Sequence, residues 1–298
     1  MSTPAKTTAT WPTHADALLR VALDEDLGDV GDITTAVSAQ GRGPASTATI
    51  RAKAVGRLSG LPLAARVFEM VDPGVVVELK ASDGDPVEPG KVVLVARGSA
   101  ASLLEAERTA LNVLQRLSAV ASMTARFVAE TEGTRARIVD TRKTTPGFRT
   151  LEKAAVLHGG GHNHRVGLFD EVLLKENHFA LAGALGYQGL VAKARAELPG
   201  IKVTAEAENM EEARAAADGG AHVILLDNFG VQRWAAAVTE FAKHPKRADF
   251  ELEASGGVDL STVGDIARTG VDRISVGALT HSAPALDLSM LLEMDSTE

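Results

Sequence analysis

The run Val223-Ile224-Leu225-Leu226, which ends on Asp227, shows the pattern from which the fold class of this chain is inferred. A parallel strand that is buried on both faces reads as a continuous apolar run. Similar runs recur between residues 136 and 276, and each ends on a charged residue or opens into a charged or glycine-bearing stretch. The runs and the residues that follow them are 137–140 with Thr141-Arg142-Lys143-Thr144, 172–174 with Lys175, 203–205 with Glu206, 223–226 with Asp227, 250–254 with Ser255-Gly256-Gly257, and 274–276 with Gly277. Because charges at the carboxyl ends of parallel strands are typical of the active-site face of a β/α barrel, the pattern predicts an enzyme.

Helical segments alternate with these runs at a spacing of about 20 to 35 residues per unit, as β/α barrels show. They are expected at residues 151–157, 182–198, 210–218, 231–242 and 259–269. About six strands are recognisable where a complete barrel has eight. The sequence therefore predicts an α/β fold with an incomplete β/α barrel (TIM-like), which we assign to residues 114–282 as the catalytic domain.

The residues before the barrel have a different pattern of apolar and polar residues. Between residues 46 and 98, short alternating runs are broken by turns, which predicts antiparallel strands around a helix at residues 63–70. A first helix is expected from an N-cap at Thr13 to residues 26–28, followed by turns through Asp32. Leucines at a helical period predict a long helix at residues 101–130. Residues 284–294 are expected to return to this domain.

These expectations divide the chain into a flexible tail (residues 1–12), an N-terminal α+β open sandwich domain (13–113 plus 283–298) and the barrel. The composition fits that size: 298 residues are 45% hydrophobic and 23% charged, as in a globular protein with a substantial core. The absence of cysteine excludes disulfides, thiolate metal sites and a cysteine nucleophile.

The net charge and the hydropathy of the chain argue against two classes of binding partner, nucleic acids and membranes. The net charge of −8 argues against nucleic acid. No apolar run approaches the roughly 18 residues that span a bilayer, so no membrane is expected as a partner. The N-terminus lacks the apolar core of a signal peptide, and we expect a cytoplasmic protein.

The densest cationic stretch runs from Asp140 to Arg149 and contains Arg142 and Lys143. A second set, His164-Arg165, lies in a glycine-rich loop, and Lys175 ends the next strand. Arginine offers a planar fork for carboxylates, and lysine a compact charge for phosphate. Three cationic sets on one rim predict a ligand with several negative charges.

Three histidines crowd the segment from His158 through His162 to His164. Imidazoles at such short spacing can share a metal ion. The loop holds no carboxylate, however, and Arg165 would repel a cation. We favour hydrogen-bond donation from His164 to an anion, with metal binding as the alternative.

Carboxylates and glycines occupy the later strand ends. Glu206 and Asp227 suit Mg²⁺ shared with substrate phosphates, and Glu208 could contribute; alternatively each is half of an ion pair with Lys175 or Lys143. Ser255-Gly256-Gly257 and Val276-Gly277-Ala278 suit a phosphate held by backbone N–H groups. The sequence therefore predicts a phosphate pocket, a divalent metal and a separate cationic pocket.

The chain resembles the quinolinate phosphoribosyltransferase family on motifs that span nearly its whole length. They are 25–28 with 31–35, 107–112, 141–149, 159–161 with 164–165, 167–168 and 170, 175–178, 206–209, 226–228, 255–257 and 276–281. The Thr-Arg-Lys-Thr and His-Arg motifs together are highly specific. The resemblance implies phosphoribosyl transfer from phosphoribosyl pyrophosphate to quinolinate with decarboxylation. The products would be nicotinate mononucleotide, pyrophosphate and CO₂, in NAD biosynthesis.

The resemblance also implies residue roles. It implies a homodimer whose active site is shared, with Arg108 reaching the partner subunit. Quinolinate would be held by Arg108, Thr141, Arg142, Lys143, His164, Arg165 and Lys175. Phosphoribosyl pyrophosphate would be held by Lys143, Glu206, Asp227, Ser255, Gly256, Gly257, Val276 and Gly277, with Mg²⁺ on Glu206 and Asp227. Two departures, at residues 118–120 and at Ala205 and Ala207, concern packing rather than contacting groups.

Other functions remain open at this point. Lys175 or Lys143 at a strand end could form a Schiff base in an aldolase or lyase acting on a phosphorylated substrate. The hairpin at residues 83–90 resembles those of biotinyl and lipoyl carriers, which would make the chain a carrier or binding protein. Within the resemblance, a molybdenum-associated paralogue shares the barrel, and the complete cationic set argues for the quinolinate branch.

Overall fold

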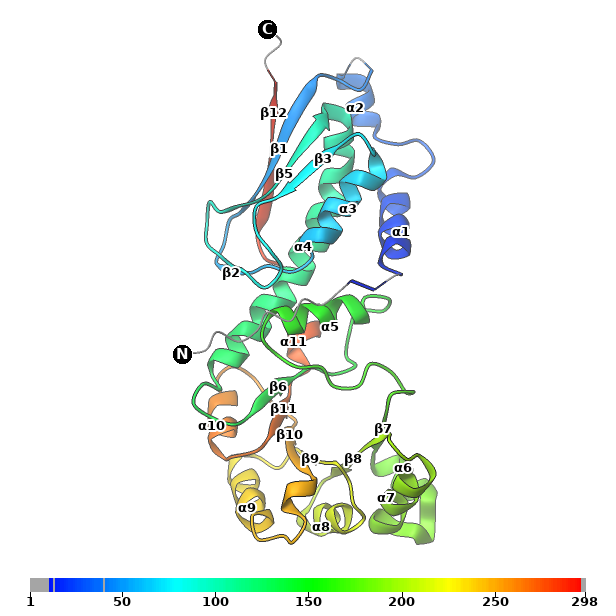
Figure 1. The fold of residues 1–298 in the computed structure, drawn as a ribbon, viewed down its shortest axis with the longest axis vertical. Helices are drawn as coiled ribbons and strands as arrows, with labels where there is room; N and C mark the ends of the chain where they lie inside the picture. Colours follow the sequence, from blue (N-terminus) through cyan, green and yellow to red (C-terminus); the bar gives the residue numbers. More distant parts are fainter. Residues whose placement is uncertain (1–10, 13, 40, 296–298) are drawn as a thin grey trace. The chain divides into compact units, whose positions relative to one another are not determined.

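The computed structural model describes residues 11–12, 14–39 and 41–295. The chain forms two compact units (Figure 1). The first contains the described residues up to Ala125, Thr145–Gly160 and the residues from Ala283 onward, and the second contains Arg126–Thr144 and Gly161–Ser282. The boundaries expected from the sequence differ from these units mainly in α4 (Ala100–Ala129) and α5 (Arg149–His158). Most of the predicted tail lies outside the described residues.

The first unit is built on a four-stranded sheet in the order β12-β1-β5-β3. Its strands are β1 (Ala45–Ala52), β3 (Val76–Leu79), β5 (Val92–Ser99) and β12 (Leu288–Met294), and β2 (Gly56–Arg57) pairs separately with β4 (Pro86–Val87). All neighbours are antiparallel, and β12 pairs with β1 from Ser46↔Met294 to Ala52↔Leu288. The expected return of the C-terminal segment is therefore confirmed. Alternate residues of β1 (Ala48, Ile50, Ala52) are fully buried, as one apolar face of a sheet requires.

Helices of the first unit are α1 (Ala15–Leu27), α2 (Ile33–Ser38), α3 (Leu61–Val71), α5 and most of α4. The predictions for α1, α3 and α4 are confirmed to within a few residues. The N-cap of α1 is His14, and the predicted cap Thr13 lies outside the described residues. Helix α2 is a correction, because turns alone were expected there. It forms because the Asp32 carboxylate accepts hydrogen bonds from the backbone N–H groups of Thr34 and Thr35, at 2.9 and 3.0 Å.

The second unit is built on a six-stranded parallel sheet in the order β6-β11-β10-β9-β8-β7. The strands are β6 (Arg137–Val139), β7 (Glu171–Leu174), β8 (Lys202–Ala207), β9 (Val223–Asp227), β10 (Glu251–Ser255) and β11 (Arg273–Ser275). Between and after them lie α6 (Glu176–Ala182), η1 (Gly183–Leu185), α7 (Gly186–Glu197), α8 (Met210–Asp218), α9 (Val231–Phe241), η2 (Arg247–Asp249), α10 (Val263–Arg268) and α11 (Ala278–His281). All six predicted strands are confirmed. The edge strands β6 and β7 are not paired with each other, so the barrel is incomplete.

The two faces of this sheet differ in character. Leu252 and Ala254 of β10 are fully buried, and so are Val203 and Ala205 of β8. The alternate positions of β10 carry Glu251, Glu253 and Ser255. Since successive strand residues point to opposite faces, one face is apolar and the other is polar. The expectation of strands that are apolar on both faces is thus wrong for β10.

Among the described residues, no helix combines the length and apolarity needed to cross a membrane.

We predict that Leu252→Ala lowers the free energy of unfolding of the second unit by about 2 to 5 kcal/mol, because a fully buried leucine leaves a cavity. In a Trp11→Phe background the fluorescence of Trp234, which is buried in this unit, reports urea unfolding. Leu198→Ala, at a 45% exposed position directly after α7 of the same unit, is the control and should change stability by less than about 0.5 kcal/mol. Equal effects of the two changes would contradict the assignment of Leu252 to the core.

Candidate active site

A pocket of about 850 Å³ lies within the second unit, at the carboxyl ends of the parallel strands. Residues that follow β6 and residues of β7 both line it, although these strands are opposite edges of the sheet. The sheet therefore curves so that its strand ends converge on one hollow. The predicted site residues that line the pocket are Thr141, Arg142, Lys143, His164, Arg165, Lys175, Glu206, Asp227, Ser255, Gly256, Gly257 and Gly277.

Two predicted site residues do not line this pocket. Val276 is 1% exposed, and its backbone N–H donates to the carbonyl of Val139 at 2.9 Å, so neither its side chain nor its N–H is available to a ligand. Arg108 lies on α4 in the first unit with a 57% exposed side chain, and its Nη2 is 3.9 Å from Glu107 Oε1. Its expected role in a partner's site stays a prediction.

The arginines of the pocket carry unpaired donors. The Nε atoms of Arg142 and Arg165 are buried and have no hydrogen-bond partner among the described residues. Burial, and then the charge of Arg142, lower the pKa of Arg165. A buried N–H without a partner costs about 1 to 3 kcal/mol. An anionic acceptor in the pocket would remove that cost, and carboxylates match the guanidinium fork best.

The carboxylates of the pocket are held by neighbours. Lys175 Nζ forms an ion pair with Glu206, which is the alternative that the sequence left open for this residue. Asp227 Oδ2 accepts a hydrogen bond from Asn228 Nδ2 at 2.6 Å. Glu208 does not line the pocket, because β8 ends at Ala207 and the chain turns before residue 208. The neighbouring Glu176 raises the pKa of Glu208 through a hydrogen bond and its charge.

The three crowded histidines do not form a cluster. His158 belongs to the first unit, where its Nδ1 lies 2.9 Å from Ser59 Oγ. His162 belongs to the second unit and forms a parallel bridge with Val139. Within the part of the chain that the structure describes, no group of three or more His, Cys, Asp or Glu side chains is arranged to hold a metal ion. The alternative of a histidine metal site is therefore wrong for these residues.

The glycine loops have conformations that require glycine. Gly256 has φ +95°, and a Cβ there would lie 2.1 Å from Asn228 Oδ1. Gly257 has φ +60° with open space around it. A Cβ on Gly277 would lie 3.1 Å from Lys143 Cδ, and Thr280 Oγ1 donates to the carbonyl of Lys143 at 2.7 Å. These contacts bring the loop after β10 close to the loop after β9, and the loop after β11 close to the loop after β6.

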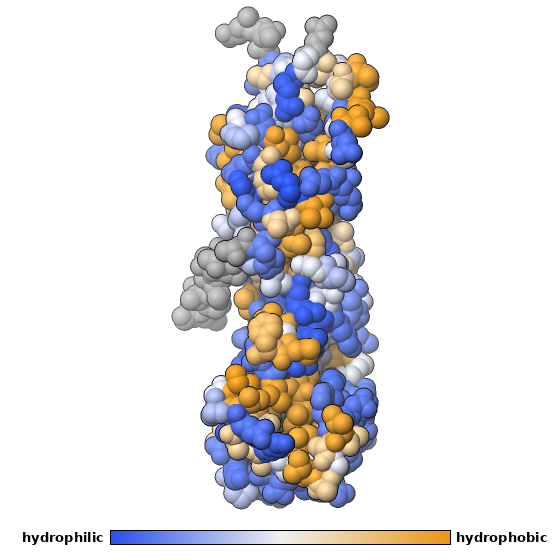
Figure 2. Space-filling model, turned by 90° about the vertical axis from the view of Figure 1, so that its right-hand side faces the viewer, coloured by the Kyte–Doolittle hydropathy of each residue, from blue (hydrophilic) through white to orange (hydrophobic). Residues whose placement is uncertain are grey.

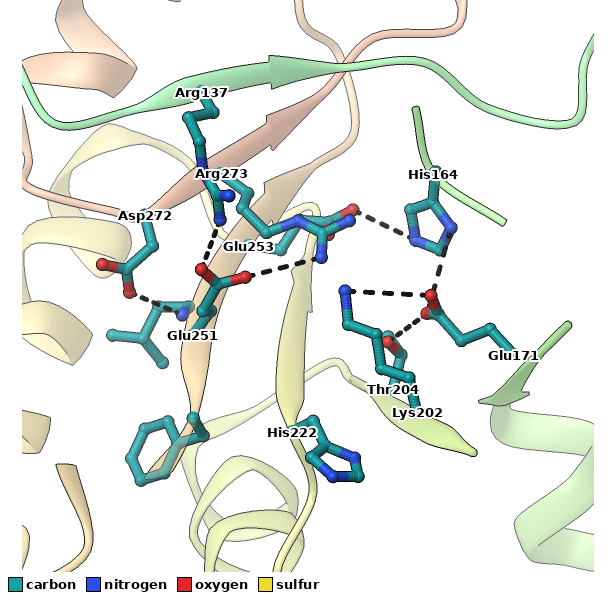
Figure 3. A network of polar contacts seen from close by, with 12 residues as sticks. Arg137, His164, Glu171, Lys202, Thr204, His222, Glu251, Glu253, Asp272 and Arg273 are labelled. Atoms are coloured by element: carbon teal, nitrogen blue, oxygen red, sulfur yellow. Dashed lines mark hydrogen bonds and ion pairs between the residues drawn. The ribbon is translucent and has the colours of Figure 1, made fainter. Parts of the chain in front are cut away.

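His164 is held on three sides. Its backbone N–H donates to Asp140 Oδ1 at 2.8 Å, and its Nδ1 accepts the backbone N–H of Arg165 at 2.7 Å. Its ring also lies between Glu171 and Glu253, which point to it from β7 and β10 (Figure 3). Sequence reasoning missed Glu253, a pocket-lining residue, because it lies inside a run that was read as apolar. The available signal was the alternation Glu251-Leu252-Glu253-Ala254.

Comparisons with known proteins agree over both units. Residues 32–118 match the model of the quinolinate phosphoribosyl transferase N-terminal domain, and residues 120–291 match that of the C-terminal domain. A probable nicotinate-nucleotide pyrophosphorylase [carboxylating] of Synechocystis is 40% identical over 278 residues, which cover 92% of this chain and 91% of that protein. A protein of Bacillus subtilis with the same description is 40% identical over 266 residues and 89% of each chain.

Solved structures show the same likeness. The crystal structure of NadC from Streptococcus pyogenes has a TM-score of 0.90 and 38% identity, covering 97% of this chain and all 100% of that one. The nicotinate-nucleotide pyrophosphorylase from Francisella tularensis has a TM-score of 0.88 and 35% identity, covering 95% and 98%.

We predict that Gly256→Ala destabilises the second unit more than Gly257→Ala does. Both residues have positive φ, so both changes carry the strain of about 1 kcal/mol or more that a side chain meets there. Only Gly256 adds a steric conflict with Asn228. Urea unfolding followed by Trp234 fluorescence measures the difference. A smaller loss for Gly256→Ala than for Gly257→Ala would show that the loop is not packed as described.

Proposed function

The chain belongs to the quinolinate phosphoribosyltransferase family, and we propose that the pocket of its second unit carries out the family's reaction. Phosphoribosyl pyrophosphate transfers its phosphoribosyl group to the ring nitrogen of quinolinate, and the carboxylate beside that nitrogen leaves as CO₂. The products are nicotinate mononucleotide and pyrophosphate. The observation that carries the proposal is the pair of buried, unpartnered guanidinium Nε atoms of Arg142 and Arg165, which suit an aromatic diacid.

The quinolinate site is proposed on the cationic part of the pocket. Arg142 and Arg165 would receive the carboxylates, with Lys175 and Thr141 beside them. His164 lines the same pocket, but its Nδ1 accepts from the Arg165 backbone. We therefore propose that it shapes the quinolinate site mainly by holding Arg165.

Phosphoribosyl pyrophosphate is proposed on the ends of β8, β9, β10 and β11, together with Lys143 from the loop after β6. Lys143, Glu206 and Asp227 would face the pyrophosphate and ribose, and the backbone at Ser255, Gly256, Gly257 and Gly277 would bind the 5′-phosphate. The missing Cβ at Gly256 is needed for the close approach of this loop to Asn228. Val276 would act through packing, since its N–H is already bonded.

Mg²⁺ fits this site as a partner of the substrate. Mg²⁺ keeps several waters and binds through one or two carboxylates plus substrate phosphates. Glu206 and Asp227 provide two carboxylates in the pocket, while a complete set of protein ligands is not assembled among the described residues. We propose that these two residues hold Mg²⁺, which would neutralise charge on the leaving pyrophosphate.

The contribution of the chain is mainly positioning. The guanidinium groups orient the pyridine ring so that its nitrogen faces the anomeric carbon. After transfer, the positively charged ring nitrogen stabilises the electron pair left on the adjacent carbon when CO₂ departs. That carbon then takes a proton from solvent water to form the C–H bond of the product. Strong hydrogen bonds to the departing carboxylate would oppose the loss of CO₂. The tightest contacts should therefore fall on the other carboxylate, which the product keeps.

A homodimer with shared active sites is part of the proposal. Exposed large apolar side chains occur on both units and include Val30, Val37, Leu168, Phe169 and Leu181, and Figure 2 shows apolar patches on one face of the molecule. Such patches often mark protein–protein contacts. Arg108 is exposed and more than 3.5 Å from its nearest carboxylate, Glu107 at 3.9 Å, so it is available to a partner's pocket.

The two alternative functions, a Schiff-base enzyme and a carrier protein, have less support from the structure. A Schiff-base enzyme needs a neutral lysine, but the ammonium group of Lys175 is paired with Glu206. A carrier needs an exposed lysine at the hairpin turn, and the candidates are Lys80 and Lys91. Lys80 pairs with Glu78, and the backbone of Lys91 is bonded to Glu88 and Ala52. Asp83 in the turn binds the backbone of Gly60 and Leu61. The hairpin is therefore packed against the first unit.

We predict that the chain releases CO₂ and pyrophosphate when mixed with quinolinate, phosphoribosyl pyrophosphate and Mg²⁺. Arg142→Ala should lower turnover by at least about a hundredfold, the scale of a lost charged contact that positions the reacting groups. Arg214→Ala is the matched control, because Arg214 pairs with Glu240 on the surface, outside the pocket. Near-normal turnover of Arg142→Ala would remove that residue from the active site.

We predict that inactive Arg108→Ala and Arg142→Ala subunits complement each other when mixed. In a hybrid dimer one of the two shared sites has both arginines intact, so an equal mixture should recover about a quarter of wild-type activity after subunit exchange. The measurement is CO₂ release before and after exchange. No recovery, in a mixture shown to contain hybrid dimers, would mean that Arg108 does not reach the partner's site.

A further inference from the structure

Beneath the pocket, the inner face of the sheet carries a network of charged side chains from five strands (Figure 3). Its members are Arg137, Glu171, Lys202, Glu251, Glu253 and Arg273. Lys202 Nζ lies 3.8 Å from Glu171 Oε2, and Arg273 Nη1 lies 3.5 Å from Glu251 Oε2. Each of these charges lies near an opposite charge, which offsets the desolvation cost of the three that are buried, Glu171, Glu253 and Arg273.

Glu253 is the acidic member of this network whose carboxyl oxygens lack hydrogen bonds among the described residues. It is also fully buried. Arg273 Nε lies 2.9 Å from Oε2, but its N–H does not have the geometry of a hydrogen bond to that oxygen. Burial raises the pKa of Glu253, and Arg273 and the Ser275 hydroxyl oppose the rise. That hydroxyl can rotate, and here it donates to the carbonyl of Ala254 at 3.3 Å.

The histidine above Glu253 has a defined tautomer. His164 Nδ1 accepts the backbone N–H of Arg165 at 2.7 Å, and a nitrogen that accepts a hydrogen bond carries no proton. The neutral ring therefore has its proton on Nε2. That atom lies 3.7 Å from Glu253 Oε1, while Glu171 Oε1 lies 4.0 Å from Nδ1. A carboxyl oxygen beside Nε2–H favours this tautomer and orientation over the reverse.

The tautomer matters because it holds Arg165. The backbone N–H of Arg165 is fixed by His164, and Nη1 donates to the carbonyl of Glu171 at 3.3 Å. Another donor of this guanidinium group, the buried Nε, has no hydrogen-bond partner among the described residues. If the ring of His164 turned or moved its proton to Nδ1, the backbone N–H of Arg165 would lose its acceptor. The guanidinium group would then lose its fixed place.

We propose that Glu253 is a positioning residue for the diacid: its carboxyl oxygen, 3.7 Å from Nε2 of His164, attracts the Nε2–H group and so keeps Nδ1 as the acceptor that holds the backbone of Arg165. The inference rests on the proposed function for the identity of the diacid, quinolinate. Both an ionised and a neutral carboxyl group offer an accepting oxygen, and so does the amide of glutamine. The role should therefore survive Glu253→Gln and fail in Glu253→Leu.

Steady-state kinetics of the full-length chain test the proposal. Glu253→Leu should raise the KM for quinolinate by about ten- to hundredfold, the scale of one lost charged hydrogen bond. The KM for phosphoribosyl pyrophosphate should stay within about threefold, and Glu253→Gln should stay near wild type in both. Glu251→Leu is the matched control, since Glu251 lies on the same strand and pairs with Arg273 and Arg137 but not with His164. Equal rises of both KM values, or the same pattern in Glu251→Leu, would overturn the proposal.

A spectroscopic measurement distinguishes a role of Glu253 in fixing the His164 tautomer from a general role in the stability of the fold. Nitrogen-15 NMR of histidine-labelled chain, with His164→Gln to assign the signals, should show the Nε2–H tautomer in the wild type and in Glu253→Gln. Glu253→Leu should show a mixed tautomer or the reverse one. A proton on Nδ1 in the wild type would refute the inference even if Glu253→Leu did not fold. Loss of the proposed function would appear differently, as a wild type that releases neither CO₂ nor pyrophosphate.

Discussion

Charges buried on the inner face of a parallel sheet must find partners, and this constraint organises the second unit. A buried charged side chain has lost its hydrating water, and this desolvation costs free energy unless an ion pair or hydrogen bonds offset it. Below the pocket the constraint is nearly satisfied: Lys202 lies near Glu171, and Arg273 near Glu251. At the pocket it is not satisfied, since the buried Nε donors of Arg142 and Arg165 find no acceptor in the part of the chain that the structure describes. These two arginines, with their unsatisfied donors, are therefore where a ligand with carboxylates would bind.

The same constraint links the pocket to the network of charged side chains on the polar face of the sheet beneath it. His164 joins the two layers, because its ring faces Glu171 and Glu253 below and its Nδ1 holds the backbone of Arg165 above. The polar face of the sheet is therefore a scaffold as well as a lining. The apolar face, with Leu252 and Ala254 fully buried, provides the packing that keeps the strands in place.

Sequence predicted the strands of the second unit because each is a short apolar run with a marked end, as in 223–227. It predicted most pocket-lining residues for the same reason, since carboxyl ends of parallel strands converge. It did not find Glu253, whose neighbours in the run are apolar. It also grouped His158 with His162, although the chain carries them into different units. Such groupings depend on tertiary packing, which spacing along the chain does not encode. Whether Arg108 enters a partner's pocket depends on an interface that one chain does not contain.

The unpaired Nε donors of Arg142 and Arg165, which have no acceptor among the described residues, are proposed to receive the carboxylates of an aromatic diacid. A crystal structure with quinolinate and a non-reactive analogue of phosphoribosyl pyrophosphate tests this proposal most directly. The account predicts a ligand carboxylate oxygen within about 3 Å of Nε or a terminal nitrogen of both Arg142 and Arg165. A diacid bound elsewhere, with both guanidinium groups turned to solvent, would contradict it.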